Sequence, residues 1–169
     1  QGRTVALVGE AGIGKSRLLQ ALVDGQADVL FWSGRAGDAI TPYSTLARGL
    51  GALIRGLPND AVVRMPREVK ADLARVMPEL AVAAIPPPRS SRAVMPVQAV
   101  KAVIRLAWPQ GATFVLDDLH FADDASIDLL RQCLADEDRA LWRVILTMRP
   151  SLRSPQTQQW VQQLSDAGH

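Results

Sequence analysis

The chain has 169 residues, 48% of them hydrophobic and 21% charged, which is enough to bury the core of one ordinary domain. The formal net charge is only +2 and the arginines are interspersed with acidic residues, which argues against a nucleic-acid-binding surface. A single cysteine, Cys133, excludes an internal disulfide, and no apolar run reaches the roughly eighteen residues of a membrane-spanning helix. We therefore expect a cytoplasmic protein that contacts neither nucleic acid nor membrane.

The first expected strand, residues 5–8, is followed by the sequence GEAGIGKS at residues 9–16 and then by a helical pattern over residues 17–23. The stretch GEAGIGKS consists of a glycine, four residues and Gly-Lys-Ser, and it lies between a strand and a helix. It therefore has the spacing and the context of a phosphate-binding loop. Glycine permits the dihedrals that turn several amide N–H groups toward one anion, and the following helix directs its positive end at the same place. The sequence therefore predicts a site for a nucleotide triphosphate.

The side chains of this loop predict how ATP and Mg²⁺ would be held. Lys15 would reach the β and γ phosphates as a mobile charge, and the hydroxyl of Ser16 would be a ligand for Mg²⁺. The residues expected to contact the nucleotide are Gly9, Glu10, Ala11, Gly12, Ile13, Gly14, Lys15, Ser16 and Arg17. The alternative is a glycine-rich turn that binds nothing, which the full match of spacing and context disfavours.

The next elements follow from hydrophobic periodicity. Residues 29–32 predict a second, buried strand and residues 35–42 a polar loop. Apolar residues then recur at helical spacing in three segments, 43–57, 67–76 and 94–107. The tripeptide Pro-Asn-Asp at 58–60 should end the first of these helices. Three consecutive prolines at 86–88 predict an extended, flexible loop over residues 84–93.

A continuous apolar run at residues 113–116 predicts a central strand that is buried on both faces. Asp123 or Asp124 should cap the following helix, whose inner face carries Cys133 as a small core residue. The remaining expected elements are a strand at 142–148 and a helix at 156–164. Strands that alternate with helices indicate an α/β protein with a parallel sheet and helices on both faces. The resemblance of the glycine-rich stretch to phosphate-binding loops implies a three-layer sandwich with the strand order 1-4-3-2.

Two acidic residues follow the expected central strand, at the edge of a parallel sheet where ligands bind. Asp117 would hold Mg²⁺ through a water molecule, and Asp118 would orient or deprotonate the water that attacks the γ phosphate. The alternative is an acidic turn that only caps the next helix. Aspartate is shorter than the glutamate common in this role, so Asp118 predicts slow hydrolysis.

Arg149 follows the last expected strand, which should lie beside the strand that carries the glycine-rich loop. It could sense the γ phosphate, and we place it with Lys15 and Asp118 among the residues expected to act in catalysis; the alternative is a surface arginine at a strand exit. His120 is interpreted as a packing or hydrogen-bonding residue rather than a ligand or base, because an imidazole near a site is only probabilistic evidence of a chemical role.

Four segments, GEAGIGKSRL at 9–18, PY at 42–43, VLDDLHFAD at 115–123 and LTMRP at 146–150, together resemble the ATPase module of the STAND branch of AAA-type P-loop ATPases. This version occurs in large bacterial LuxR-type transcriptional regulators, in regulators resembling the maltose-regulon activator, and in proteins with adenylate cyclase or Ser/Thr kinase domains. The resemblance spans residues 5–150.

The resemblance implies an ATP-dependent switch, in which ATP favours an open, self-associating form, ADP favours a closed one, and an attached DNA-binding, cyclase or kinase domain gives the output. It assigns the Walker A pair, the Walker B acids and the sensor arginine to Lys15, Ser16, Asp117, Asp118 and Arg149. The chain has Phe121 where the family usually has tryptophan, and we expect residues 1–169 to lack the family's fifth strand, helical lid and winged-helix part. Because the chain starts at Gln1, we expect residues 1–169 to be the ATPase core domain of a longer protein.

The favoured function is therefore an ATP-binding, Mg-dependent, slow ATPase switch module of a multidomain bacterial signalling or transcriptional regulator. A nucleotide-independent scaffold that keeps the fold is one alternative, and the intact Lys15, Ser16 and Asp117 argue against it. A small-molecule kinase of the same loop class is another. A kinase would need a phosphate-acceptor pocket and an arginine-rich lid, and nothing in the sequence indicates either.

Overall fold

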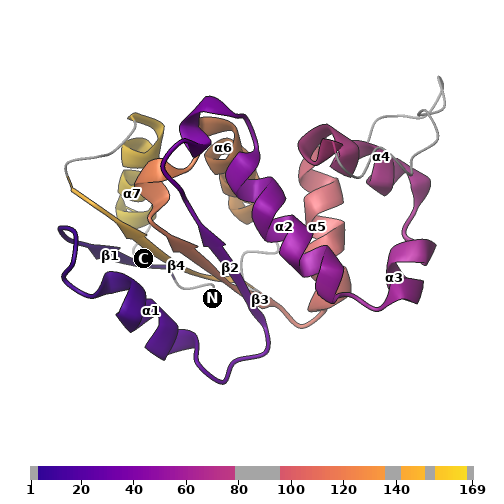
Figure 1. Cartoon of the computed structure of the whole chain (residues 1–169), viewed down its shortest axis with the longest axis horizontal. Coiled ribbons are helices and arrows are strands. Elements are labelled where there is room, and N and C mark those ends of the chain that lie inside the picture. Colours follow the sequence, from indigo (N-terminus) through magenta and orange to yellow (C-terminus); the bar gives the residue numbers. More distant parts are fainter. Residues whose placement is uncertain (1–3, 79–95, 136–141, 151–154, 167–169) are drawn as a thin grey trace.

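The computed structural model describes residues 4–78, 96–135, 142–150 and 155–166 (Figure 1). Four strands form one parallel sheet: β1 (Thr4–Val8), β2 (Val29–Ser33), β3 (Ala112–Asp117) and β4 (Trp142–Met148). Their order is β1-β4-β3-β2, so the expected order 1-4-3-2 is confirmed. The loop expected over 84–93 lies outside the described residues.

Strand β3 is central, and all six of its residues are buried. The neighbours β2 and β4 take up its backbone hydrogen bonds on both sides, and helices cover both of its faces, so an unbroken apolar run is stable there. The edge strand β1 is different, because several of its residues are exposed. The predicted burial of the central strand is therefore confirmed.

The helices form one layer on each face of the sheet. Their bounds are α1 (Lys15–Val23), α2 (Ser44–Gly56), α3 (Asn59–Arg64), α4 (Arg67–Val76), α5 (Pro96–Ala107), α6 (Asp124–Ala135) and α7 (Pro155–Asp166), with short 3-10 turns η1 (Asp38–Ile40) and η3 (Leu119–Phe121). In Figure 1, α1 lies on one side of the sheet and α2, α5, α6 and α7 lie on the other, with α3 and α4 beyond α5. The α/β three-layer sandwich is confirmed.

The two faces bury very different amounts of apolar surface. Under α1, the buried cluster consists only of Leu19, Val23 and Val115. The opposite face carries the large core, in which Phe114 packs against the rings of Trp32 and Trp142 at centroid distances of 6.0 and 5.2 Å. Most of the hydrophobic stabilisation of the domain therefore comes from that second face.

Helix α2 lies directly against strand β2. A Cβ atom added to Gly49 would lie 1.5 Å from Nε1 of Trp32, so only glycine leaves room for the indole ring. Trp32 is 2% exposed. This contact fixes the distance between the edge of the sheet and the helix that follows it.

The expected end of the helix before residues 58–60 is confirmed, because α2 ends at Gly56 with Leu57 as its C-cap. The sequence did not predict the short helix that follows, α3, which begins at Asn59 with Pro58 as its N-cap. Proline is compatible with a helix start because its φ angle is already close to the helical value. The helix has six residues, none of them buried, and so it is too short and too exposed to produce a recognisable hydrophobic period. The polar loop expected at 35–42 likewise contains the short turn η1.

Candidate functional site

The glycine-rich loop connects β1 to α1 at the carboxyl edge of the sheet. Gly12 and Gly14 have φ angles of 80° and 94°, which other L-residues rarely adopt, and Gly14 is the N-cap of α1. The amide of Gly9 donates to the carbonyl of Met148 at 3.2 Å. A hydrogen bond therefore joins the start of the loop to the end of β4, and α1 directs its N-terminus into the loop.

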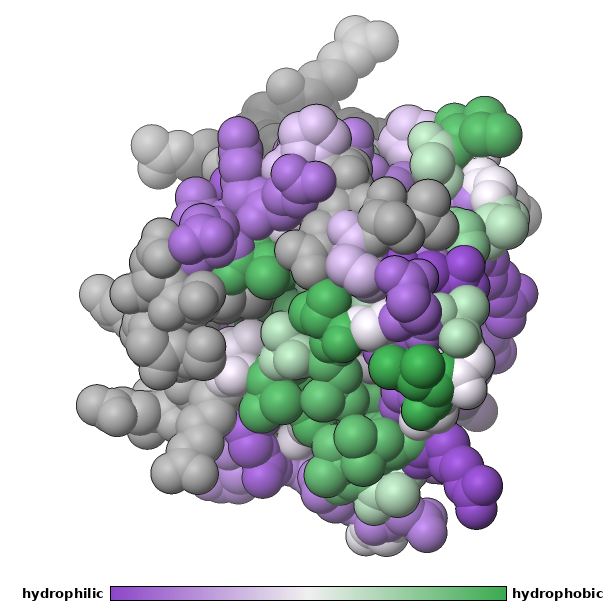
Figure 2. Space-filling model, turned by 90° about the vertical axis from the view of Figure 1, so that its left-hand side faces the viewer, coloured by the Kyte–Doolittle hydropathy of each residue, from purple (hydrophilic) through white to green (hydrophobic). Residues whose placement is uncertain are grey.

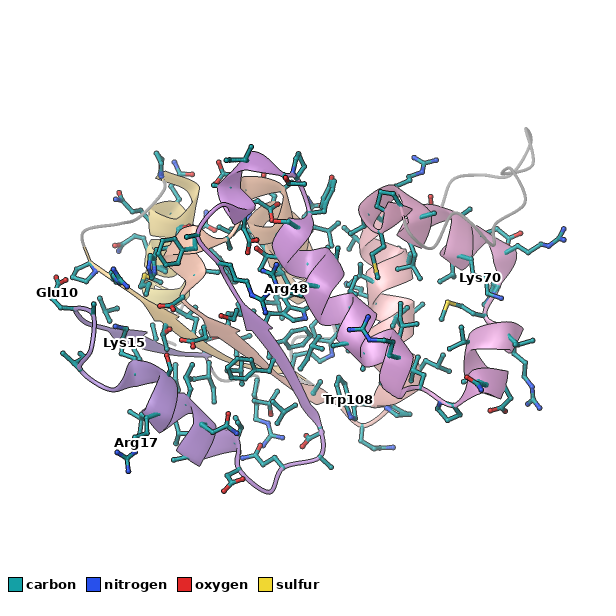
Figure 3. All side chains as sticks on the ribbon, viewed as in Figure 1. Glu10, Lys15, Arg17, Arg48, Lys70 and Trp108 are labelled. Carbon is teal, nitrogen blue, oxygen red and sulfur yellow. The ribbon has the colours of Figure 1, made fainter. Side chains whose placement is uncertain are left out.

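The side chain of Lys15 folds back over the loop. Its Nζ atom donates to the carbonyl oxygens of Gly9 at 2.7 Å and of Glu10 at 2.8 Å. Figure 3 shows Glu10 at the outer tip of the loop and Arg17 on the side of α1 that faces away from the sheet. The ammonium group thus lies against the backbone of the loop, whereas the side chain of Arg17 points away from it.

The carboxylate of Asp117 lies at the end of β3 and is joined to β4. Thr147 Oγ1 donates a hydrogen bond to Asp117 Oδ1. The amide of Asp118 donates both to the same Oδ1 atom, at 3.0 Å, and to Thr147 Oγ1, at 2.9 Å. Thr147 was not predicted from the sequence, although a hydroxyl that follows the apolar run Val144–Leu146 near the end of a strand was a signal that could have identified it.

The backbone at Asp118 has an unusual conformation that the neighbouring strand supports. Asp118 has φ 50° and ψ 44°, in the left-handed region, and its carbonyl accepts a hydrogen bond from the amide of Phe121 at 3.0 Å. The amide of Gly34, just after β2, donates to the carbonyl of Asp117 at 2.9 Å. A Cβ on Gly34 would lie 2.5 Å from the Asp118 oxygen and 2.9 Å from the Ala122 amide nitrogen. A glycine is therefore required here for the turn to approach so closely.

Arg149 follows β4, the strand that lies between β1 and β3. Its guanidinium carbon is 5.7 Å from the centre of the Phe121 ring, and its buried Nε atom has no hydrogen-bond partner among the described residues. A buried N–H without a partner is costly, so this group is available to an acceptor that enters the site.

The imidazole of His120 lies near several charged residues of the site. Burial lowers the pKa of His120 below its ordinary value; the nearby charge of Asp118 acts in the opposite direction, as does Asp117, whereas Arg149 and Lys15 lower the pKa further. Because all four charges act on one imidazole, they lie around one region of the molecule.

Asp123 anchors the turn that follows the two acids. Its buried carboxylate accepts from the amides of Tyr43 at 2.7 Å, Thr45 at 3.1 Å and Ser126 at 2.8 Å. One side chain therefore caps the N-termini of both α2 and α6. Of the two expected caps, Asp123 rather than Asp124 has this position, because α6 already begins at Asp124.

The strand order brings the loop and the acids to the two sides of the same strand end. β1 and β3 each pair with β4, so the loop after β1 and the acids after β3 are two strand spacings apart, or roughly 10 Å. An extended triphosphate can bridge such a gap. Figure 2 views the molecule from the left-hand side of Figure 1 and shows apolar side chains gathered on that face. Among the exposed apolar side chains near the glycine-rich loop are Val8, Ile13 and Leu18, at 44%, 64% and 49% exposure.

A parallel sheet with a glycine-rich loop after its first strand and an acidic pair at the end of a strand two places away defines a P-loop NTPase fold. The chain belongs to the AAA ATPase domain family, whose model matches residues 1–147. A comparison with curated proteins gives no significant match. Family membership indicates a nucleotide-binding ATPase domain. In the described part of the chain, no helix is both long and apolar enough to cross a membrane.

Proposed function

We propose that this domain binds ATP together with Mg²⁺ and hydrolyses it slowly, as the switch module of a multidomain bacterial signalling or transcriptional regulator. The observation that carries the proposal is the pair of hydrogen-bonded links across β4. Gly9 is linked to Met148, and Asp117 to Thr147, so the loop and the acidic pair are held on either side of one strand end.

The residues at this edge fit a magnesium–nucleotide complex. Both hydrogen bonds to the carboxylate of Asp117 go to Oδ1, so within the described ranges Oδ2 keeps its full capacity to accept. The exposed Ser16 stands in the first turn of α1, and hydroxyl and carboxylate oxygens are the ligands that Mg²⁺ prefers. When bound, the ion would neutralise negative charge that develops on the phosphate oxygens.

The chemistry needs little from the protein beyond positioning and charge. The oxygen of a water molecule bonds to the γ phosphorus, the bond from that phosphorus to the β–γ bridging oxygen breaks, and the bridging oxygen leaves with its electron pair on ADP. Asp118 orients the water and accepts its proton. Lys15 exchanges its two carbonyl contacts for phosphate oxygens, and Arg149 supplies the otherwise unpartnered Nε donor.

The regulatory part of the proposal rests on the resemblance to STAND-type modules, which couple nucleotide state to self-association and to an output domain. Exposed apolar side chains of β1, the glycine-rich loop and α1 support contacts beyond the described residues, since contiguous apolar surface is usually covered by a partner. The largest of these side chains are Val5, Val8, Ile13, Leu18 and Leu22.

Calorimetric titration with ATP and with ADP, each with and without Mg²⁺, tests the proposal together with single-turnover hydrolysis of γ-labelled ATP. We expect saturable binding of both nucleotides, tighter binding of ATP with Mg²⁺, and release of labelled phosphate to water. Absence of nucleotide binding would favour the scaffold, and transfer of the label to a small molecule would favour the kinase.

A further inference from the structure

His120, the middle residue of η3, is buried without the partners that its two nitrogens need. No part of its side chain is exposed, and neither Nδ1 nor Nε2 forms a hydrogen bond with any described residue. Leaving two polar atoms desolvated and unpaired costs free energy that an apolar ring of the same size would not incur. A packing role alone therefore explains this histidine poorly.

The imidazole is held in place by its neighbours. Its ring centre lies 4.1 Å from that of Phe121 at an interplanar angle of 43°, and the guanidinium of Arg149 lies near the same phenyl ring. The Nδ1 atom is 3.9 Å from Oδ1 of Asp118. A hydrogen bond needs a separation of about 2.9 Å, so an approach of about 1 Å would join the two side chains.

Asp118 can make that approach with its side chain alone. Its main chain is fixed by the hydrogen bonds that its amide donates to the side chains of Asp117 and Thr147, and by the close approach of Gly34. Its carboxylate is 33% exposed and accepts no hydrogen bond from the part of the chain that the structure describes. A small rotation of the side chain is therefore sufficient.

Burial keeps the pKa of His120 below its ordinary value, so the ring is neutral near pH 7 and carries one N–H donor. A neutral donor can hold a carboxylate without taking its negative charge, and so the carboxylate stays able to accept a proton. Which nitrogen carries the hydrogen is inferred from the position of Asp118, which faces Nδ1.

We propose that His120 is a positioning residue for ATP hydrolysis: once ATP fills the site, its imidazole donates a hydrogen bond from Nδ1 to the carboxylate of Asp118 and holds that carboxylate toward the attacking water. The proposal rests on the proposed ATPase function. His120 takes no proton itself. The proton of the water passes to Asp118 as the water oxygen bonds to the γ phosphorus and ADP departs.

Thr113 offers a matched control. Its Oγ1 atom is likewise buried without a hydrogen-bond partner among the described residues, and it lies on β3, but near the amino end of the strand and away from the acidic pair. Replacing either orphaned group by an apolar one should leave the ATP-free protein as stable or more stable. Only the replacement at His120 should change catalysis.

The experiment compares wild type, His120→Phe, His120→Asn and Thr113→Val in thermal unfolding without nucleotide, in ATP affinity, and in kcat and KM. For His120→Phe we expect no loss of stability, ATP affinity within about twofold of wild type, and a kcat lowered about 10- to 100-fold. His120→Asn should recover part of the rate because its amide nitrogen can take the place of Nδ1. Thr113→Val should hydrolyse ATP at the wild-type rate.

A second readout does not need turnover. The chain has two histidines, so the imidazole signal of His120 can be assigned by NMR from its loss in His120→Phe. Addition of a non-hydrolysable ATP analogue should produce a protected Nδ1–H signal. That signal should be absent from the Asp118→Ala variant, which has no side-chain acceptor at this position.

These outcomes separate the two proposals. Three results would together overturn the role of His120 and leave the ATPase function intact. The wild-type protein would bind ATP, His120→Phe would have an unchanged kcat, and no new Nδ1–H signal would appear. Failure of wild type to bind ATP would overturn the proposed function and this inference with it. Should His120→Phe fold poorly, His120→Asn is compared with His120→Gln, whose amide nitrogen replaces Nε2; a higher kcat for asparagine supports the proposal, and equal values contradict it.

Discussion

The hydroxyl of Thr147 on β4 donates a hydrogen bond to the carboxylate of Asp117 at the end of β3, and it accepts one from the amide of Asp118. This network of hydrogen bonds joins the carboxyl ends of β3 and β4, the two central strands of the sheet. It fixes the orientation of Asp117 and the position of the next residue at the same time.

Thr147→Val should therefore destabilise the domain. The valine keeps the volume but leaves the Asp118 amide one acceptor short and removes the donor to Asp117, so we expect a loss of about 1–3 kcal/mol in the free energy of unfolding. Urea denaturation measures it, and Thr147→Ser, which retains the hydroxyl, should stay much closer to wild type. Equal stability of the valine variant and wild type would show that the network contributes nothing.

Lys15→Ala should weaken binding of Mg-ATP by at least about 100-fold, because the loop loses its mobile charge and a charge-assisted hydrogen bond. The fold should be preserved, since the hydrogen bonds that the ammonium donates within the described part of the chain go to the carbonyls of Gly9 and Glu10 in the loop itself. Lys70→Ala is the control, because Lys70 donates to a carbonyl on α3, far from the loop in Figure 3. Calorimetry that finds unchanged affinity in Lys15→Ala would contradict the assignment of the loop.

Asp118→Asn should lower the single-turnover rate of ATP hydrolysis about 100-fold while leaving ATP affinity nearly unchanged, because the amide cannot accept the proton of the attacking water. Asp24→Asn changes an exposed carboxylate at the other end of α1 and should have no effect on the rate. Equal rates for Asp118→Asn and wild type would remove Asp118 from the mechanism.

Gly49→Ala should destabilise the domain by about 1–3 kcal/mol, since the new methyl group overlaps the Trp32 indole and forces α2 away from β2. Gly56→Ala, on the same helix, meets no atom within 4 Å and should be neutral or stabilise by up to about 1 kcal/mol. Chemical denaturation of both variants gives the comparison. Equal effects at the two positions would mean that the indole can move aside.

Asp38 should make stability depend on acid pH. Burial alone would raise its pKa, but hydrogen bonds from Arg48, the Arg35 amide and Thr45, with the charge of Arg48, hold the pKa below the ordinary value. A lowered folded-state pKa contributes stability that is present above the unfolded value of about 4 and is lost as the pH falls through the folded value.

The wild-type protein should thus have a higher free energy of unfolding than Asp38→Asn. This difference should be largest near pH 6 and should shrink as the pH falls below about 4. Asp60→Asn is the control, because the Asp60 side chain is 65% exposed and its ion pair is with Arg64 on the surface of α3. A difference that stays constant between pH 6 and pH 2 would show that ionisation of Asp38 does not contribute to stability.

Much of the architecture could be predicted because its signals are local. The spacing of glycines before Lys15 indicated the loop, and the apolar run at 113–116 indicated the central strand. The helix α4 matches its expected range of 67–76. Helix α3 was missed because six exposed residues do not form a hydrophobic period. The roles of Lys15, Ser16, Asp117, Asp118 and Arg149 remain predictions, and the variants above test those of Lys15 and Asp118.

By itself, the sequence determined the class of this protein, because a phosphate-binding loop requires particular residues within one short segment, and the alternation of strands and helices restricts the possible sheets. Only the tertiary structure decided which polar groups meet. Thr147 and Asp117 are 30 residues apart, and Asp123 reaches an amide 80 residues away. Such pairs depend on strand register and helix packing, which no local pattern specifies. That His120 finds no hydrogen-bond partner among the described residues likewise depends on the elements packed around it.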